Sequence, residues 1–306
     1  MSVIADIVDT MQALAGSHPG HRRAHAKGIV ATGTFHPSAD ARRLTKAAHL
    51  QGGAVAVTVR FANSSGNPDV PDGAPGVRSL SVKFPLGDGR TADVLANSVE
   101  GFPASTPEEF LGFLRAQLPD PMTGKPDPAA VPKFLGSHPS AAAFIGRLMQ
   151  KPVPASYAQV SYHAEHAFLF TAADGSRRYG RYHLVPDAGE AFLTPEEGAK
   201  RPANFLREEL DHRLSRGPVT FRLVLQLAAE GDPTHDPSTL WPAERPRVEL
   251  GRLEITRISP TSAEDEKRLI FDPTNRTDGI ELSNDPILLA RSEAYSISYE
   301  RRSRGQ

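Results

Sequence analysis

The feature that most constrains the fold of this chain is a series of short runs in which apolar and polar residues alternate. AVAVTVRF at residues 54–61 and VTFRLVLQL at residues 219–227 are the clearest runs, and β-branched or aromatic residues dominate both. Further runs of this kind, bounded by Gly, Pro, Asp or Asn, occupy residues 29–35, 80–84, 157–162, 166–170, 179–185 and 248–255. Many strands without regularly intervening helices predict an antiparallel sheet or barrel rather than a parallel α/β fold.

Two loops between these runs have clear sequence signals. HAFLF and RYGRYHLV are joined by TAADGSR, in which Asp174-Gly175 is a favourable turn dipeptide, so this pair predicts a β-hairpin. The acidic, Gly-rich stretch at residues 67–76 lacks the regular ligand spacing and the closing Glu of a calcium loop. We interpret it as a long loop between strands.

Helices are fewer, and capping residues mark their starts. Thr106-Pro107-Glu108-Glu109 is a capping box with Pro at the first helical position. Further helices are predicted at residues 203–214 and at residues 285–302, where an Asp-Pro pair begins the helix. Residues 1–16 predict a short amphipathic helix rather than a signal peptide, because two acidic residues interrupt the apolar stretch and no basic leader precedes it.

The composition excludes several classes of function. The 306 residues include no cysteine, which removes disulfides, thiolate metal sites, iron–sulfur clusters and thiol nucleophiles. The net charge of -1 favours neither nucleic acid nor an anionic membrane, and no segment is long and apolar enough to span a bilayer. We therefore expect a cytoplasmic protein with one domain, residues 1–306. The Pro-rich stretch from Pro119 to Pro139 is expected to cross the surface between its two halves.

Arg291 and Tyr295 are candidate site residues in the C-terminal helix. They are four residues apart and so lie one turn apart on the same helix face. Free tyrosine stays neutral at physiological pH, whereas a neighbouring guanidinium favours the phenolate and a bound ferric ion favours it far more. The pair therefore suits an anionic oxygen ligand, although packing and a surface cation are the ordinary interpretation of such a pair seen alone.

A basic segment, HRRAHAKG at residues 21–28, precedes the first predicted strand. Its His25 suits proton transfer because the unperturbed imidazole pKa lies near neutrality, and Arg22 could bind a carboxylate beside it. A solvated basic turn is the alternative. Asn97 ends a later apolar segment, where its amide could donate to a bound oxygen ligand and Phe102 could keep the pocket dry. Asn97 is otherwise an ordinary turn residue.

Other constellations point to no chemistry. In HAEH, His163 and His166 suggest a metal pair, but residues three apart on a strand point to opposite faces. We interpret both histidines as packing or surface residues. No GxSxG elbow is present to support hydrolysis.

Four segments, taken together and in this order, resemble the catalase superfamily over most of the chain. RRAHAKG resembles the segment of the distal histidine, and VTVRFANSSG with GVRSLSVKF resembles the next two barrel strands. VLANSVEGF resembles the segment with the distal asparagine, and FDPTNRTDGIELSNDPILLARSEAY resembles the proximal region, where RxxxY supplies the haem ligand. The resemblance implies an α+β fold, with an antiparallel β-barrel, surrounding helices and a C-terminal haem-ligating helix.

The resemblance also implies roles for the candidate residues. Tyr295 would be the axial ligand of the ferric iron of haem, of the haem b type, and Arg291 would support its phenolate. His25 and Asn97 would form the catalytic pair on the distal side of the iron. The remaining haem contacts would come from Arg22, Arg60 and Arg291 near the propionates, and from Phe102 against the porphyrin.

Two departures from the family pattern affect these expectations. The family has a hydroxyl residue after VRF that holds the distal histidine, but this chain has Ala62. Two alternatives follow: either Ser64 or Ser65 substitutes, or His25 is held more loosely, which would slow peroxide cleavage and favour peroxidase over catalase activity. Only eleven residues follow Tyr295, so we expect neither the helical C-terminal region of ordinary catalases nor its NADPH-binding surface. These features resemble the small catalase-related peroxidase branch, and a monomer or small homo-oligomer is expected.

The expected function is a haem-dependent peroxidase that reduces hydrogen peroxide or organic hydroperoxides with a small organic electron donor and has residual catalase activity. One alternative is a minimal catalase, which dismutates hydrogen peroxide. Another is a haem-binding barrel without turnover. The retained His25 and Asn97 argue against the last alternative, because a carrier needs no distal acid–base pair.

Overall fold

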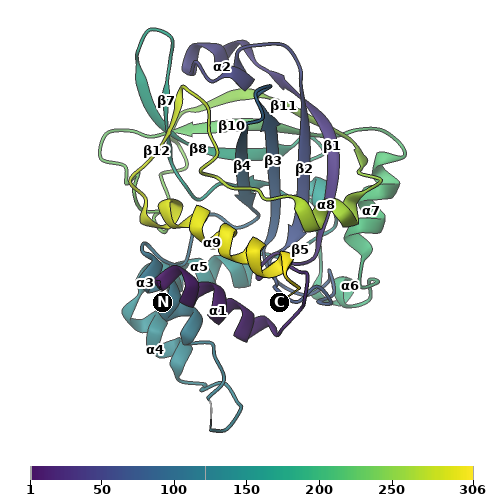
Figure 1. Cartoon of the computed structure of the whole chain (residues 1–306), viewed down its shortest axis with the longest axis vertical. Coiled ribbons are helices and arrows are strands. Elements are labelled where there is room, and N and C mark those ends of the chain that lie inside the picture. Colours follow the sequence, from purple (N-terminus) through teal and green to yellow (C-terminus); the bar gives the residue numbers. More distant parts are fainter. Residues whose placement is uncertain (1, 121, 306) are drawn as a thin grey trace.

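A closed antiparallel sheet forms the centre of the computed structural model, which describes residues 2–120 and 122–305 (Figure 1). The strands of the closed sheet are β1 (Gly28–Pro37), β2 (Val55–Asn63), β3 (Arg78–Pro85), β4 (Thr91–Asn97), β6 (Tyr162–His163), β8 (Arg177–Pro186), β10 (Val219–Leu227) and β11 (Arg247–Ile258). Their order is β10-β11-β1-β2-β3-β4-β6-β8, and β8 pairs again with β10. These eight strands therefore form the predicted barrel, and β7 (Phe168–Thr171) and β12 (Ile280–Leu282) continue the sheet beyond β8.

Alternation along the strands fills the barrel interior. Phe35 on β1, Phe61 on β2 and Phe221 on β10 are each 0% exposed, and they belong to one hydrophobic cluster. Burying a ring of this size contributes roughly 1.5–3 kcal/mol. The period-two runs thus identified the strands because they carry the inward-facing apolar residues.

The sequence misassigned some of the strands. Residues 157–162, predicted as a strand, begin with a short 3-10 helix, Tyr157–Gln159, whose start is capped by Ser156 Oγ accepting from Ala158 N at 3.0 Å. Only Tyr162 of that run lies in a strand. The run at 166–170 enters β7 only at Phe168. β4 was not among the predicted runs, because Asp93 interrupts it, and Lys83 neutralises this buried carboxylate at 2.6 Å.

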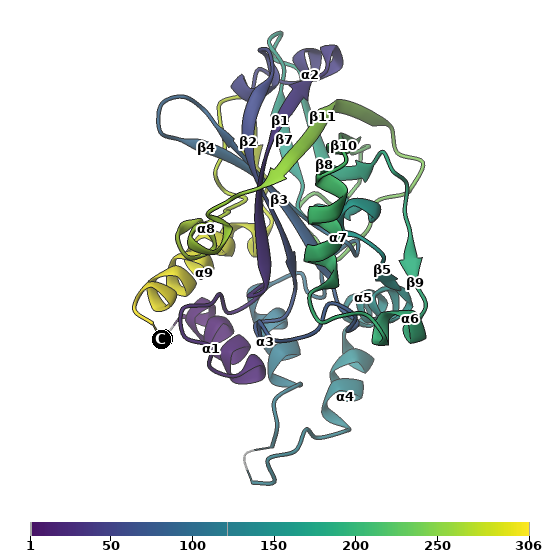
Figure 2. The same ribbon diagram turned by 90° about the vertical axis from the view of Figure 1, so that its right-hand side faces the viewer.

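Helices cover one end of the barrel (Figure 2). The helices of the chain are α1 (Val3–Ala15), α2 (Ala39–Leu44), α3 (Pro107–Arg115), α4 (Ala130–Ser137), α5 (Pro139–Gln150), α6 (Pro195–Ala199), α7 (Phe205–Leu214), α8 (Ser262–Arg268) and α9 (Pro286–Ser303). α1, α3 and α9 share a second apolar cluster formed by Ile4, Ile7, Leu111 and Leu114 with side chains of α9. The amphipathic N-terminal helix is confirmed, and its apolar face closes this end of the barrel.

Side-chain caps start α3 and α9, whereas the predicted helix α7 begins after Asn204 without a side-chain cap. Asp285 Oδ1 accepts from the backbone of Ile287 and Leu288 at the start of α9. Thr106 Oγ1 accepts from Glu109 N at 3.2 Å, but the Glu109 carboxylate accepts from Ser105 N rather than from Thr106 N. The predicted capping box is therefore only half formed.

Two loop predictions have different outcomes. The hairpin of β7 and β8 turns at Gly175, whose φ of +85° lies in the left-handed region that glycine adopts without strain. The stretch from Pro119 to Pro139 is not a simple crossing, since it contains α4, and its Pro121 lies outside the described residues. A two-stranded sheet of β5 (Val153–Pro154) and β9 (Phe192–Leu193) follows this stretch along the chain.

Within the described ranges, no helix has the length and apolar character needed to cross a membrane.

Candidate functional site

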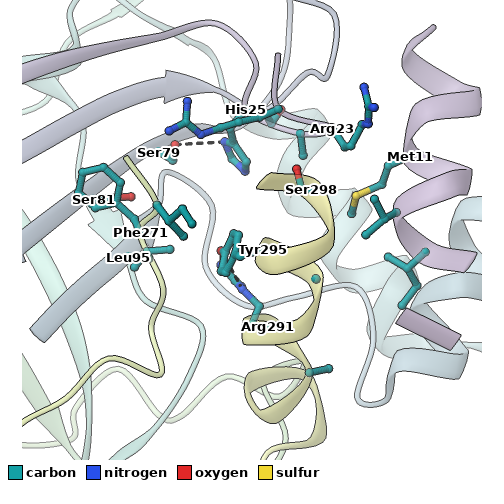
Figure 3. A pocket seen from close by; sticks show the side chains of 18 of the residues that line it. Met11, Arg23, His25, Ser79, Ser81, Leu95, Phe271, Arg291, Tyr295 and Ser298 are labelled. Atoms are coloured by element: carbon teal, nitrogen blue, oxygen red, sulfur yellow. Dashed lines mark hydrogen bonds between the residues drawn. The ribbon is translucent and has the colours of Figure 1, made fainter. Parts of the chain in front are cut away.

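A cavity of about 350 Å³ lies between the barrel wall and the helices α1, α3 and α9 (Figure 3). This volume falls within the range of small-molecule and cofactor pockets. All of the site residues predicted from the sequence line this one cavity: Arg22, His25, Arg60, Asn97, Phe102, Arg291 and Tyr295. They come from segments up to 273 positions apart, so the fold, rather than local sequence, brings them together.

Tyr295 and Arg291 face the cavity from α9 (Figure 3). Arg291 Nε donates to Tyr295 Oη at 3.0 Å, and Nη2 donates to the same oxygen. Burial raises the pKa of Tyr295, and the Arg291 charge and its hydrogen bonds offset only part of that rise. Arg291 alone therefore does not ionise the phenol, and a second cation at Oη is needed to do so.

A chain of hydrogen bonds fixes Arg291. His166 lies between Asp285 and Arg291, with Nδ1 at 2.7 Å from Asp285 Oδ2 and Nε2 at 3.2 Å from Arg291 Nη1. The carboxylate that caps α9 thus also orients the imidazole behind Arg291. The sequence interpretation of His166 as a packing or surface residue missed this contact. His163 and His166 do not share a site, but strand geometry is not the reason, because β6 ends at His163 and His166 lies in the bend before β7.

His25 lies on the opposite side of the cavity, in a strained backbone conformation. Its φ of +55° is the only positive φ of a described residue other than glycine. The conformation is held by His25 N donating to Ser64 O at 3.1 Å and by Arg60 Nη2 donating to His25 O at 2.6 Å. Burial, with the charge of Arg60 next in effect, lowers the pKa of His25 to about 3. The imidazole is therefore neutral near pH 7 and can accept a proton.

Ser79 supplies the hydroxyl that Ala62 lacks. Its Oγ lies 3.1 Å from His25 Nδ1 (Figure 3). Ser79 on β3 is the cross-strand partner of Ala62 on β2, so both side chains occupy the same face of the sheet. Neither alternative from the sequence holds: Ser64 and Ser65 contact the His25 turn through backbone carbonyls, and Ser79 provides the hydroxyl instead. Finding Ser79 from the sequence would have required the register of β2 against β3.

Arginines make one wall of the cavity positive. Glu266 Oε2 accepts from Arg22 Nη1 at 2.6 Å, and Glu266 Oε1 accepts from Arg60 Nε at 2.7 Å. Arg302 also lines this wall, where it donates to the Lys267 carbonyl at 3.2 Å. A single carboxylate thus faces three guanidinium groups, which leaves positive charge for an anionic ligand.

Glu165 connects the two sides of the site, and sequence reasoning missed it. Its Oε1 accepts from Arg291 Nη1 at 2.7 Å, and its Oε2 accepts from Asn97 Nδ2 at 3.2 Å. Burial alone would raise the pKa of Glu165, but the Arg291 charge holds it below its usual value. Phe102 lies beyond Asn97, with its ring centroid 4.8 Å from that of Phe110. The only sequence signal for Glu165 was its place between the two histidines of HAEH.

The donor set fits an iron porphyrin. A buried phenol that needs a second cation faces a neutral imidazole across the cavity, and the arginine wall can hold two carboxylates. The remaining lining is largely apolar, with Ile4, Ile7 and Val8 of α1 and Ala290 and Ala294 of α9. An amphipathic macrocycle with one charged edge matches this distribution.

Comparison with known proteins gives consistent matches over nearly the whole chain. Residues 5–305 match the family model described as Catalase. The catalase-related peroxidase of Mycolicibacterium paratuberculosis is 41% identical over 296 residues, covering 96% of this chain and 93% of the relative. That of Synechococcus elongatus is 35% identical over 299 residues, covering 98% and 88%.

Solved structures support the fold. A bacterial catalase superposes with a TM-score of 0.83 at 24% identity, covering 94% of this chain and 58% of the catalase chain. Catalase A from Saccharomyces cerevisiae also gives a TM-score of 0.83, at 21% identity, with coverages of 94% and 62%. This chain therefore spans about three fifths of these catalases, and at such identities the likeness concerns the barrel and its helices.

Proposed function

The chain belongs to the catalase family, in the branch of the catalase-related peroxidases, and we propose on this premise that it is a haem-dependent peroxidase. The reaction reduces hydrogen peroxide to water, or an organic hydroperoxide to an alcohol and water. A small organic donor supplies the two electrons and two protons. The observation that carries the proposal is the pair Tyr295–Arg291 facing His25 across one cavity. Residues 1–306 form its single haem-binding domain in this proposal.

Residues from several elements that line the cavity are the proposed contacts of haem b. Tyr295 Oη would hold the iron, and Arg291 would support the charge on this oxygen. Arg22 and Arg60, with Arg302 beside them, are the proposed partners of the propionates, and Phe102 packs against the ring. When bound, ferric haem supplies the iron that exchanges electrons with peroxide.

His25 moves the proton in this proposal. Ser79 Oγ lies 3.1 Å from His25 Nδ1. In the proposed tautomer Nδ1 donates to Ser79 Oγ, which leaves the Nε2 lone pair free to accept the proton of the near peroxide oxygen and return it to the leaving oxygen. Asn97 uses one N–H on Glu165, and its second N–H is available to orient the peroxide. The neutral state of His25 is required for the first step, and its lowered pKa secures it at physiological pH.

A minimal catalase is the second candidate, because both reactions use the same site and differ only in the reductant. Ala62 no longer argues for weak peroxide cleavage, since Ser79 restores the contact to His25. The preference for peroxidase activity rests instead on the relatives named catalase-related peroxidase at 41% and 35% identity. Comparing peroxide consumption with and without an organic donor separates the two candidates.

The test begins with the absorption spectrum of the purified, haem-loaded protein before and after peroxide. Tyr295→Phe should alter or abolish the ferric spectrum, whereas Tyr299→Phe, one turn further along α9, is the matched control and should leave it unchanged. His25→Ala should retain haem but lose most peroxide turnover. Failure to retain haem, or full turnover in His25→Ala, would contradict the proposed function.

A further inference from the structure

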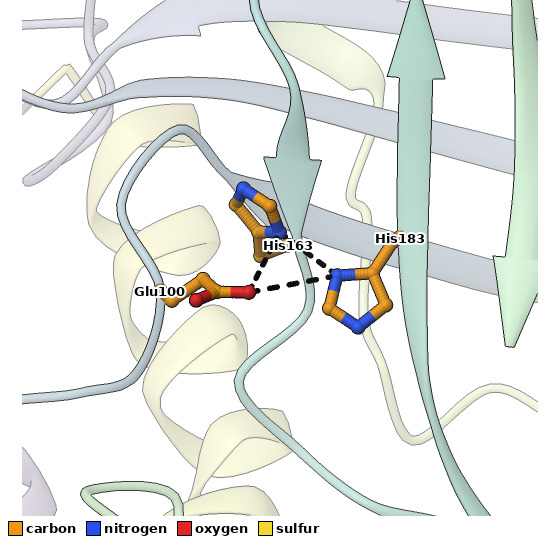
Figure 4. A group of neighbouring side chains, drawn as sticks. All are labelled: Glu100, His163 and His183. Carbon is orange, nitrogen blue, oxygen red and sulfur yellow. Dashed lines mark hydrogen bonds and ion pairs between the residues drawn. The ribbon is translucent and has the colours of Figure 1, made fainter. Parts of the chain in front are cut away.

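Three ligating side chains converge outside the haem cavity (Figure 4). Glu100, His163 and His183 offer one carboxylate oxygen and two imidazole nitrogens that all lie within 4.8 Å of one another. His163 Nδ1 and His183 Nδ1 are 2.8 Å apart, and Glu100 Oε1 lies 3.2 Å from the former and 3.9 Å from the latter. None of these side chains lines the cavity described above.

The barrel itself sets this arrangement. His163 on β6 and His183 on β8 are direct cross-strand partners, so their side chains extend on the same face of the sheet. Asn97, the last residue of β4, pairs with His163, and Glu100 follows three residues later in the loop. Arg147 Nε holds that loop by donating to Glu100 O at 3.2 Å. The three ligands are thus carried by three segments with fixed register.

The three atoms present more lone pairs than protons. Two neutral imidazoles that face each other through Nδ1 can place only one N–H between them. If His183 donates to His163, Glu100 Oε1 receives no proton from either ring. A cation at the centre would instead accept a lone pair from each of the three atoms.

Two imidazoles and a carboxylate are side-chain types that ligate divalent metal ions. Burial lowers the pKa of both His163 and His183 to about 4, so neither ring is charged near pH 7. The charge of Arg247 contributes to the lowering at both histidines, and that of Lys151 contributes at His163. Neutral imidazole and carboxylate together suit a borderline divalent ion.

We propose that Glu100, His163 and His183 form a site for a divalent transition-metal ion, with Zn²⁺ as the best match. Zinc binds imidazole nitrogen and carboxylate oxygen at about 2.0–2.2 Å, which in a tetrahedron separates neighbouring ligand atoms by roughly 3.3 Å. The observed separations of 2.8, 3.2 and 3.9 Å bracket this value. The Glu100 side chain is 39% exposed, so a water molecule can reach the ion and serve as its fourth ligand.

The bound ion would connect β6 and β8 to the loop that follows β4. Glu100 lies between Asn97 and Phe102, both of which line the haem cavity. A zinc ion in this position would restrain the loop between these two residues. Its binding does not depend on haem or on the proposed peroxidase reaction.

The experiment uses the full-length, haem-loaded protein, stripped with a chelator and dialysed against Zn²⁺. We expect one zinc per chain by elemental analysis and a higher melting temperature with Zn²⁺ than without it. His183→Ala and His163→Ala should each weaken zinc affinity by about 100-fold or more, since even partners of metal ligands contribute 10–100-fold. His212→Ala, an exposed histidine on α7, is the matched control and should bind zinc like the wild type.

Glu100→Gln provides the second test, because its side chain is 39% exposed and its replacement does not disturb the core. Zinc affinity should fall in this variant, while haem content and the ferric absorption spectrum stay unchanged. Wild-type protein that retains no zinc would overturn the proposal. Equal zinc affinity in Glu100→Gln, His183→Ala and His212→Ala would overturn it too, whatever the outcome of the haem experiments.

Discussion

Replacing Ser79 by Ala tests how the protein orients His25. The substitution removes one oxygen, 3.1 Å from His25 Nδ1, at the wall of the cavity, where Ser79 is 7% exposed. A hydrogen bond of this kind contributes about 0.5–1.5 kcal/mol, and leaving a buried partner unsatisfied costs about 1–3 kcal/mol. If this energy selects the tautomer with a free Nε2, its loss lowers peroxide turnover by roughly 3–10-fold.

The assay is stopped-flow peroxide reduction by the haem-loaded protein, with haem content measured in parallel. Ala62→Ser combined with Ser79→Ala returns a hydroxyl to the same face of the sheet from the neighbouring strand, so we expect it to recover part of the lost rate. Ser79→Thr keeps the hydroxyl and should stay close to the wild type. Wild-type turnover in Ser79→Ala would refute the idea that Ser79 fixes the tautomer of His25.

Three further perturbations have expected outcomes. First, burial lowers the pKa of His25 to about 3 and that of His49 to about 4. The free energy of unfolding should therefore fall as pH drops below about 6.5, because only the unfolded chain then binds these protons. Urea denaturation at several pH values should give a slope of roughly 1.4 kcal/mol per pH unit for each histidine. Second, Glu266→Ala leaves the guanidinium groups of Arg22 and Arg60 without their shared carboxylate. The free energy of unfolding should fall by about 3–5 kcal/mol in the same assay. A loss below about 1 kcal/mol would show that these ion pairs are not needed for stability. Third, the Glu165 charge raises the pKa of Tyr295, so Glu165→Gln should lower that pKa, which alkaline titration of phenolate absorption in haem-free protein measures against Tyr295→Phe.

The barrel was predictable because its strands bury one face. Runs such as Val219–Leu227 coincide with the observed β10, since buried and exposed positions alternate along a strand as apolar and polar residues do in the sequence. The run at 157–162 failed because Ser156 caps a turn there, and a single hydroxyl acceptor outweighed the strand propensity of the residues that follow. Local hydrogen bonds of this kind are not visible in a hydrophobic pattern.

The sequence named site residues in two ways. Spacing supported the pairs Arg291–Tyr295, on one helix face, and Arg22–His25, in one turn, whereas the resemblance to the catalase superfamily was needed to include Arg60. Ser79 and Glu165 depend on which strand lies beside which, and register is set by the whole barrel. His183 likewise acquires its neighbour His163 only through the pairing of β6 with β8.

The charge state of Tyr295 links the fold to haem binding and gives a final prediction. Burial raises the pKa of this phenol, and Arg291, which also donates a hydrogen bond to Glu165, offsets only part of the rise. Tyr295 is therefore protonated at neutral pH in the haem-free protein. The proposed iron ligand is the phenolate, and binding must therefore release one proton. Haem affinity should rise about tenfold per pH unit between roughly pH 6 and 9, measured by spectroscopic titration. Tyr295→Phe should bind haem weakly and without this slope, whereas Tyr299→Phe should keep it. An affinity independent of pH in the wild type would mean that Arg291 already ionises the phenol, or that another atom holds the iron.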